Sequence, residues 1–202
     1  MVRLEKIEYK PMPVRDLLVE IKDLSELMID LAYSAALFHS HELAEEVLEL
    51  ETHVDTLAYI LKMNTMLAAR DAEDAEALVG VSIVASAANK ISDAAADIAA
   101  LALREVHIHP IVRDAFSKVE EQLVRAEVKS NSILVGKKLG KLELAARIGV
   151  DIIAIRRKRK WIINPEENEV ISNEDIVFAR GAPQGIEELQ MIAEGALQKF
   201  GD

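Results

Sequence analysis

Four carboxylates in the first half of the chain could bind a metal ion. Glu51 and Asp55 are four residues apart, and so are Asp93 and Asp97. On a helix this spacing places both members of a pair on one face, where like charges destabilise the helix unless they are neutralised. A divalent cation is one solution, because hard cations prefer carboxylate oxygens. Otherwise the carboxylates face water or pair with basic side chains, for which the candidates are Lys62, Arg70 and Lys90.

The second half contains a basic run over residues 156–160, Arg-Arg-Lys-Arg-Lys. On a hairpin, alternate residues face opposite sides, so Arg156 and Lys158 would share one face. Such a pair could hold a small anionic ligand such as a phosphate-bearing nucleotide, and we expect these two residues to bind it. The run could also bind an acidic lipid surface, an acidic patch on a partner or the acidic half of this chain, or simply form a solvated turn.

Catalytic motifs are missing from the sequence. There is no Gly-x-Ser-x-Gly, no phosphate-binding P-loop and no His-Glu-x-x-His. No Gly-x-Gly-x-x-Gly turn follows a predicted strand, so we expect no dinucleotide cofactor to bind in that way. The chain has no cysteine, which excludes thiolate metal sites and cysteine nucleophiles. We therefore predict a protein that is not an enzyme, whose one possible cofactor is a divalent metal ion.

Charge is distributed unevenly along the chain, whose net charge is −11. Residues 1–120 contain 11 basic and 22 acidic residues, whereas residues 121–202 contain 13 of each. An acidic surface repels phosphates, which argues against a nucleic-acid polymer as partner. The longest uncharged stretch of the third predicted helix, Ala77–Asn89, is shorter than the roughly 20 residues of a membrane span. With no cysteine and a charged N-terminus, we expect a cytoplasmic protein without a transmembrane segment.

The first half has the periodicity of long helices. Apolar residues recur at helical spacing over 14–39, 40–69 and 72–103, and a fourth, short helix is predicted over 111–120. Ser40 and Asp71 are predicted N-caps of the second and third helices. Three long helices with short turns indicate an antiparallel bundle.

The second half has a mixed pattern, so the predicted fold class is α+β with two domains, 1–120 and 121–202. We expect a strand near 123–127, a short helix ending at Ile148 and a strand over 150–155. Residues 161–163, 169–171 and 175–180 should form further strands, and 186–200 a final helix.

Residues 121–202 resemble the TrkA-C domain, the C-terminal module of regulators of potassium conductance. The resemblance rests on Leu134-Val-Gly-Lys-Lys-Leu139, on Ile153-Ala-Ile-Arg156 and on Asn164-Pro165, followed by Ile176-Val-Phe178 and Gly181. It implies a β-α-β-β-β-α arrangement that dimerises, and a role in cation transport as the sensor of a small ligand. The partner it implies is a membrane transporter or channel subunit for potassium or another cation.

Residues 1–120 resemble the PhoU helical bundle, which repeats the acidic motif Glu/Asp-x-x-x-Asp. Glu51-Thr-His-Val-Asp55 matches the first copy. In the second copy, the family's glutamate is replaced by Asn89, and Asp93 and Asp97 follow. The resemblance implies that these acidic residues can hold metal ions.

Two functions follow as hypotheses. The first is a non-enzymatic regulatory subunit of potassium or other cation transport, a homodimer located in the cytoplasm or at the inner membrane through its partner. The alternative is a metal-binding adaptor of PhoU type in phosphate-transport signalling.

Overall fold

The computed structural model describes residues 12–104, 106, 109, 111 and 121–200. The chain divides into two compact units, residues Met1–Val106 and His107–Asp202. The predicted boundary at 120 and the predicted helix over 111–120 fall in a stretch that lies mostly outside the described residues.

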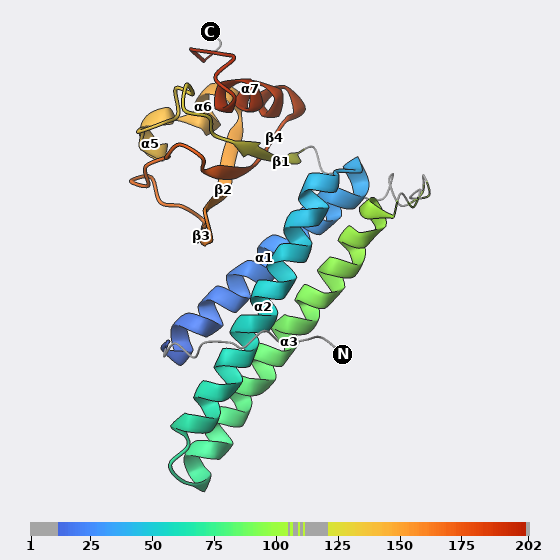
Figure 1. Cartoon of the computed structure of the whole chain (residues 1–202), viewed down its shortest axis with the longest axis vertical. Helices are drawn as coiled ribbons and strands as arrows, with labels where there is room; N and C mark the ends of the chain where they lie inside the picture. The colour runs from blue at the N-terminus through green and yellow to red at the C-terminus, as the bar shows by residue number, and fades with distance from the viewer. Residues whose placement is uncertain (1–11, 105, 107–108, 110, 112–120, 201–202) are drawn as a thin grey trace. The chain divides into compact units, whose positions relative to one another are not determined.

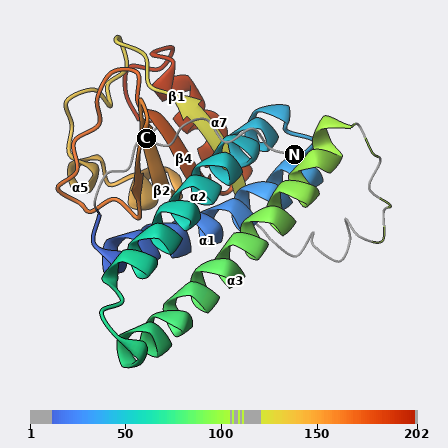
Figure 2. The same ribbon diagram turned by 60° about the horizontal axis from the view of Figure 1, so that its bottom comes forward.

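The first unit consists of three long antiparallel helices, as predicted. They are α1 (Val14–Phe38), α2 (His41–Ala68) and α3 (Ala72–Leu103), and they lie side by side in two views (Figures 1 and 2). Both predicted N-caps are present. The Ser40 hydroxyl accepts a hydrogen bond from the Leu43 N–H at 3.3 Å, and the Asp71 carboxylate accepts one from the Asp74 N–H at 2.9 Å. These bonds satisfy N–H groups that the helix itself leaves unpaired.

The core of the bundle is divided unequally between its helices. Large aliphatic side chains fill it from α1 and α2, including Leu17, Ile21, Leu50 and Leu61. The apolar residues that α3 buries are all alanines: Ala85, Ala95, Ala96, Ala99 and Ala102. Small residues allow α3 to approach its neighbours closely. No large apolar side chain among the described residues of α3 is fully buried, and Val79 and Ile83 are exposed.

The second unit is a four-stranded antiparallel sheet with short helices. Its strands are β1 (Gln122–Glu127), β2 (Val150–Arg157), β3 (Lys160–Ile163) and β4 (Ile176–Gly181), in the order β1-β4-β2-β3. Between β1 and β2 lie α5 (Leu139–Leu142) and α6 (Leu144–Ile148), and α7 (Pro183–Ala193) follows β4. The predicted α+β class and the order of elements are confirmed.

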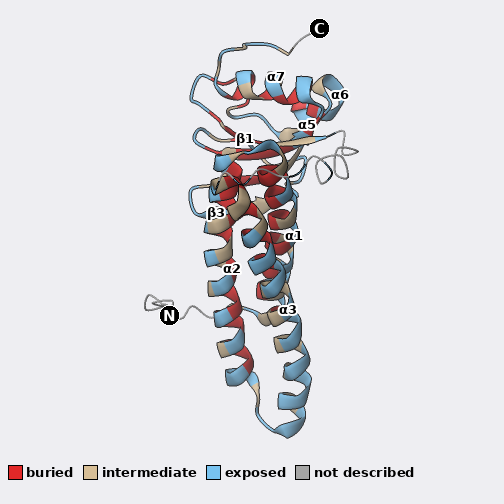
Figure 3. Cartoon of the chain, turned by 90° about the vertical axis from the view of Figure 1, so that its right-hand side faces the viewer, coloured by how far each residue is buried: buried red, intermediate tan, exposed pale blue. Residues whose placement is uncertain are grey.

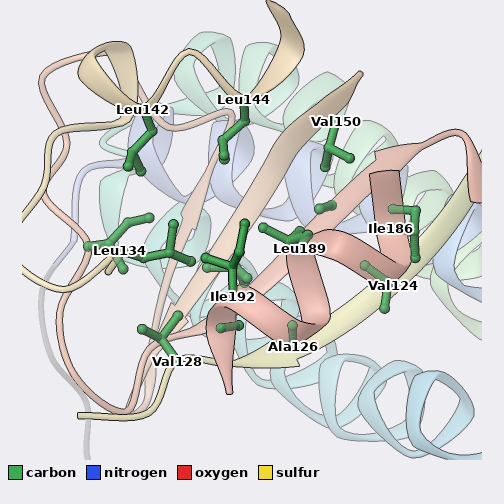
Figure 4. Close-up of a cluster of buried hydrophobic side chains, with 14 of the residues drawn as sticks. Val124, Ala126, Val128, Leu134, Leu142, Leu144, Val150, Ile186, Leu189 and Ile192 are labelled. Atoms are coloured by element: carbon green, nitrogen blue, oxygen red, sulfur yellow. The ribbon is translucent and has the colours of Figure 1, made fainter. Parts of the chain in front are cut away.

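The core of this unit lies between the sheet and its helices. One cluster of buried side chains contains Leu189 and Ile192 of α7, Val124 and Ala126 of β1, and Leu142 and Leu144 (Figure 4). Close packing also requires a residue without a side chain at the start of α7. A Cβ atom on Gly185 would lie 2.0 Å from the carbonyl oxygen of Ile148.

Two predictions for the second unit are corrected by the structure. Residues 169–171 do not form a ladder strand, since only an isolated bridge joins Val170 to Lys138. The final helix ends at Ala193 rather than at 200, because the chain turns at Gly195, whose φ of +74° is left-handed.

Among the described residues, no helix combines the length and the apolar character that a membrane span requires.

Candidate functional site

The basic run lies on the hairpin formed by β2 and β3. Arg156 pairs with Trp161 and Arg157 with Lys160, so Lys158 and Arg159 form the two-residue turn. Lys158 has a left-handed φ of +58°. The expectation that Arg156 and Lys158 share a strand face is wrong, because β2 ends at Arg157 and the alternation of a strand does not continue through the turn.

Arg156 lies against an aromatic surface. Its guanidinium carbon is 5.9 Å from the centre of the Trp161 ring, and that ring lies 5.0 Å from the ring of Phe178 in a tilted arrangement. A cation over an indole face is worth about 0.5–1 kcal/mol at a partly exposed position. The stack therefore restrains the Arg156 side chain beside the turn. A restrained side chain loses less conformational freedom when an anion binds, so this preorganisation favours binding.

Arg157 has a structural role instead. Its Nε and Nη2 atoms each donate to the carboxylate of Asp175 at 2.8 Å, and its Nη1 donates to Glu169 at 3.0 Å. Asp175 is fully buried and also accepts a hydrogen bond from the Ser172 N–H at 2.7 Å. The hydrogen bonds that Arg157 donates to Asp175, followed by the charge of Asp175 and then by the hydrogen bond to Glu169 and its charge, hold the pKa of Arg157 well above its usual range. Sequence reasoning missed this pair, because nothing in the sequence links two residues 18 positions apart.

The remaining cations of the run are open to solvent. Lys158, Arg159 and Lys160 are exposed at the tip of the hairpin, whereas Arg156 and Arg157 are half-buried. The hairpin thus presents an exposed cationic tip, residues 158–160, with the restrained guanidinium of Arg156 at its base. That arrangement can bind an anion by charge-assisted hydrogen bonds.

The acidic cluster, defined as Glu51, Asp55, Asp93 and Asp97, forms between α2 and α3. Burial, followed by repulsion from the other three carboxylates, raises the pKa of Glu51. Burial and repulsion from Asp55 and Asp97 likewise raise the pKa of Asp93. The two pairs, each on one face of its own helix, are therefore close enough for their charges to interact. Asn89, at the altered motif position, donates a long hydrogen bond of 3.4 Å to Asp93.

The cluster does not form a set of metal ligands in this conformation. Over the described residues, no three carboxylate or imidazole groups converge closely enough to hold one ion. Of the suggested basic partners, Arg70 pairs with Asp74 at 2.7 Å instead. His53, which lies between Glu51 and Asp55 in sequence, contacts Glu20 of α1 at 3.3 Å.

Comparison with known families separates the two units. Residues 18–102 match the PhoU domain, and residues 123–193 match the TrkA-C domain. The chain is a PhoU domain followed by a TrkA-C domain. The acidic cluster belongs to the PhoU domain, and the basic hairpin belongs to the TrkA-C domain.

Among curated proteins, the chain is similar to Ktr system potassium uptake protein C of Bacillus subtilis (strain 168). The two are 32% identical over 75 residues, which are 37% of this chain and 34% of that protein. The match thus spans about a third of the length of the relative.

Solved structures with partial similarity include an RCK_C domain dimer of S. agalactiae BusR in complex with c-di-AMP. Its sequence is 25% identical to the matched part of this chain, and the match covers 36% of this chain and 90% of that one, with a TM-score of 0.34. Another is the RCK C domain of the potassium transport protein KtrA in complex with cyclic diadenosine monophosphate, 24% identical, covering 40% of this chain and 94% of that one with a TM-score of 0.33.

Proposed function

We propose that this chain is a regulatory, non-enzymatic subunit of a potassium transport system, and that its TrkA-C domain senses a small anionic ligand. The observation that carries the proposal is the family match over residues 123–193, together with the 32% identity to a potassium uptake protein. As a homodimer located at the cytoplasmic side of a membrane transporter, the chain would need no span of its own.

The hairpin supplies the chemistry for an anion. Lys158 carries an exposed ammonium group, and Arg156 carries a guanidinium restrained by Trp161. A planar guanidinium suits two phosphate oxygens at once, whereas a lysine provides a mobile point charge. Arg157 is occupied by Asp175 and Glu169, so it would not contribute directly. The ligand class that fits best is a small molecule bearing one or two phosphates.

Binding can regulate transport only if it changes an equilibrium. A ligand shifts a protein between two arrangements by no more than its difference in affinity for them. We therefore propose that the anion binds one arrangement of the dimer more tightly than the other, and that the transporter responds to that arrangement. The PhoU domain would either bind the transporter or transmit the change.

The test is a thermal-shift screen of the full chain against nucleotides, including cyclic dinucleotides, and inorganic phosphate. A ligand that binds only the folded protein raises the melting temperature by mass action. We expect one phosphate-bearing compound to give a shift that is lost in Lys158→Ala and Arg156→Ala but retained in Lys199→Ala, which removes an exposed cation elsewhere in the same compact unit. No shift with any compound, or equal shifts in all variants, would contradict a ligand site on the hairpin.

The metal-binding adaptor role remains a separate prediction for the PhoU domain. The same screen with divalent cations on metal-stripped protein tests it. A shift that disappears in Asp55→Ala plus Asp93→Ala would support that role, and an unchanged melting temperature would count against it.

A further inference from the structure

Helix α3 has an apolar face that its own bundle leaves uncovered. Val79 and Ile83 are 55% and 63% exposed, although both are large aliphatic residues in a long helix. With Ser82, Ser86, Ala87 and Lys90 they line a shallow groove along one side of α3. Exposed residues extend along the first half of this helix in Figure 3. A contiguous apolar strip of this kind indicates an interaction surface.

The charges on this face are arranged symmetrically about Ile83. Glu76 lies seven residues before Ile83 and Lys90 lies seven residues after it, and seven residues are close to two helical turns. The three side chains therefore lie on one stripe. Both charged residues are exposed, and within the described part of the chain neither forms an ion pair.

We propose that this face binds the same face of a second copy of the chain, with the two α3 helices antiparallel and Ile83 at the two-fold axis. In that arrangement Lys90 of one copy lies opposite Glu76 of the other, twice per dimer. Val79 lies opposite Ala87 in the same way, so a large side chain meets a small one. The face is thus complementary to itself in shape and in charge, as an isologous interface must be.

Charge favours a second copy over an unrelated acidic or neutral partner. Lys90 is the only basic residue between Arg70 and Arg104, so two bundles of this acidity would repel each other through most other surfaces. An antiparallel arrangement centred on Ile83 places that single lysine against Glu76 in both halves of the dimer. A contact between two helices of this length is smaller than a standard interface of about 1,600 Å². We therefore expect a weak association that depends on protein concentration.

Cysteine crosslinking of the full chain tests the arrangement, because the natural sequence contains no cysteine. Ile83→Cys should give a disulfide-linked dimer under mild oxidation, since residue 83 faces its own copy. Val19→Cys on α1, which is 49% exposed, is the matched control and should remain a monomer on a denaturing gel. Equal crosslinking of both variants, or none in Ile83→Cys, would overturn the proposal and leave α3 to a different partner.

A mixed experiment tests the orientation. Val79→Cys and Ala87→Cys should crosslink when mixed but not alone, because in the antiparallel pair each position is about 12 Å along the axis from its own copy, too far for a disulfide. Self-crosslinking of Val79→Cys would show a parallel pair and overturn the proposed geometry.

Charge reversal tests the ion pairs. In the Ile83→Cys background, Glu76→Lys and Lys90→Glu should each lower the dimer yield several-fold, and the double reversal should restore it, because both pairs are re-formed with opposite sign. Failure of the double variant to recover would contradict pairing between Glu76 and Lys90.

Discussion

Arg157 and Asp175 are joined by two hydrogen bonds of 2.8 Å between a half-buried guanidinium and a fully buried carboxylate. The pair connects the end of β2 to the turn that precedes β4. Glu169 and the carbonyl oxygen of Val170 accept further hydrogen bonds from the same guanidinium. One arginine of the basic run thereby ties the loop over residues 169–175 to β2, in addition to the backbone hydrogen bonds that join this loop to residues 128 and 136–139.

Removing this arginine should destabilise the TrkA-C domain strongly. Arg157→Ala leaves the Asp175 carboxylate buried without its cation, and breaking such a pair costs about 3 kcal/mol. Arg157→Lys should cost less, because an ammonium group restores the charge but not the two parallel hydrogen bonds. Urea unfolding of the full chain measures both. Arg159→Ala, an exposed cation two residues away, is the control and should be neutral; a loss in Arg159→Ala as large as in Arg157→Ala would contradict this role.

The acidic cluster should make the PhoU domain less stable at neutral pH than at mildly acidic pH. The pKa values of Glu51 and Asp93 are raised in the folded chain, by burial first and by neighbouring carboxylates second. The folded state therefore binds protons more tightly than the unfolded state, so stability falls as pH rises through these pKa values. This loss of stability is complete at neutral pH, and it disappears as the pH falls toward the ordinary carboxylate pKa of about 4.

Asp93→Asn tests that assignment, because it removes one negative charge without changing the shape of the side chain. We expect a gain of about 0.5 kcal/mol at pH 7, the scale of one like-charge helix pair, and a smaller gain at pH 5. Thermal unfolding at both pH values measures it. Glu187→Gln on α7 removes a charge outside the cluster and should not reproduce the effect. A loss of stability in Asp93→Asn at pH 7 would contradict the repulsion.

Two glycines should respond to alanine with opposite signs. Gly185→Ala places a Cβ atom 2.0 Å from the Ile148 carbonyl oxygen, so the backbone of α7 or α6 must move and the TrkA-C domain loses stability. Gly80→Ala meets no atom within 4 Å and lies inside a helix, where alanine is favoured by about 1 kcal/mol. Calorimetry of the two variants measures both changes in stability. An increase in the stability of Gly185→Ala would contradict the packing of α7 on α6.

The parts of this structure that depend on local chemistry could be predicted from the sequence. Ser40 and Asp71 cap their helices because each side chain lies close to the N–H groups that it satisfies. The four-residue spacing of Glu51 and Asp55, and of Asp93 and Asp97, places each pair on one helix face. Residues 169–171 are predicted as a strand from their composition alone, but they form one isolated bridge and backbone hydrogen bonds to residues 136–139 rather than a ladder. The contacts that Arg157 adds come from a distant part of the chain, which propensity does not report.

It is harder to predict which residues of the basic run lie on the same face, because that depends on the position of the turn. A turn at Lys158 and Arg159 separates Lys158 from the strand that contains Arg156. The outward face of α3 also does not follow from the sequence. The sequence shows that α3 is rich in small residues, but only packing shows that alanines face the core while Val79 and Ile83 do not.

The most direct test of a ligand-sensing hairpin uses Trp161, the only tryptophan in the chain. Its ring lies 5.9 Å from the Arg156 guanidinium, so an anion bound there should change its fluorescence. We expect titration of the full chain with a phosphate-bearing nucleotide, such as a cyclic dinucleotide, to give a saturable change that is lost in Lys158→Ala and kept in Lys199→Ala. A flat titration across the nucleotide panel, in protein that is folded, would contradict the proposed sensor.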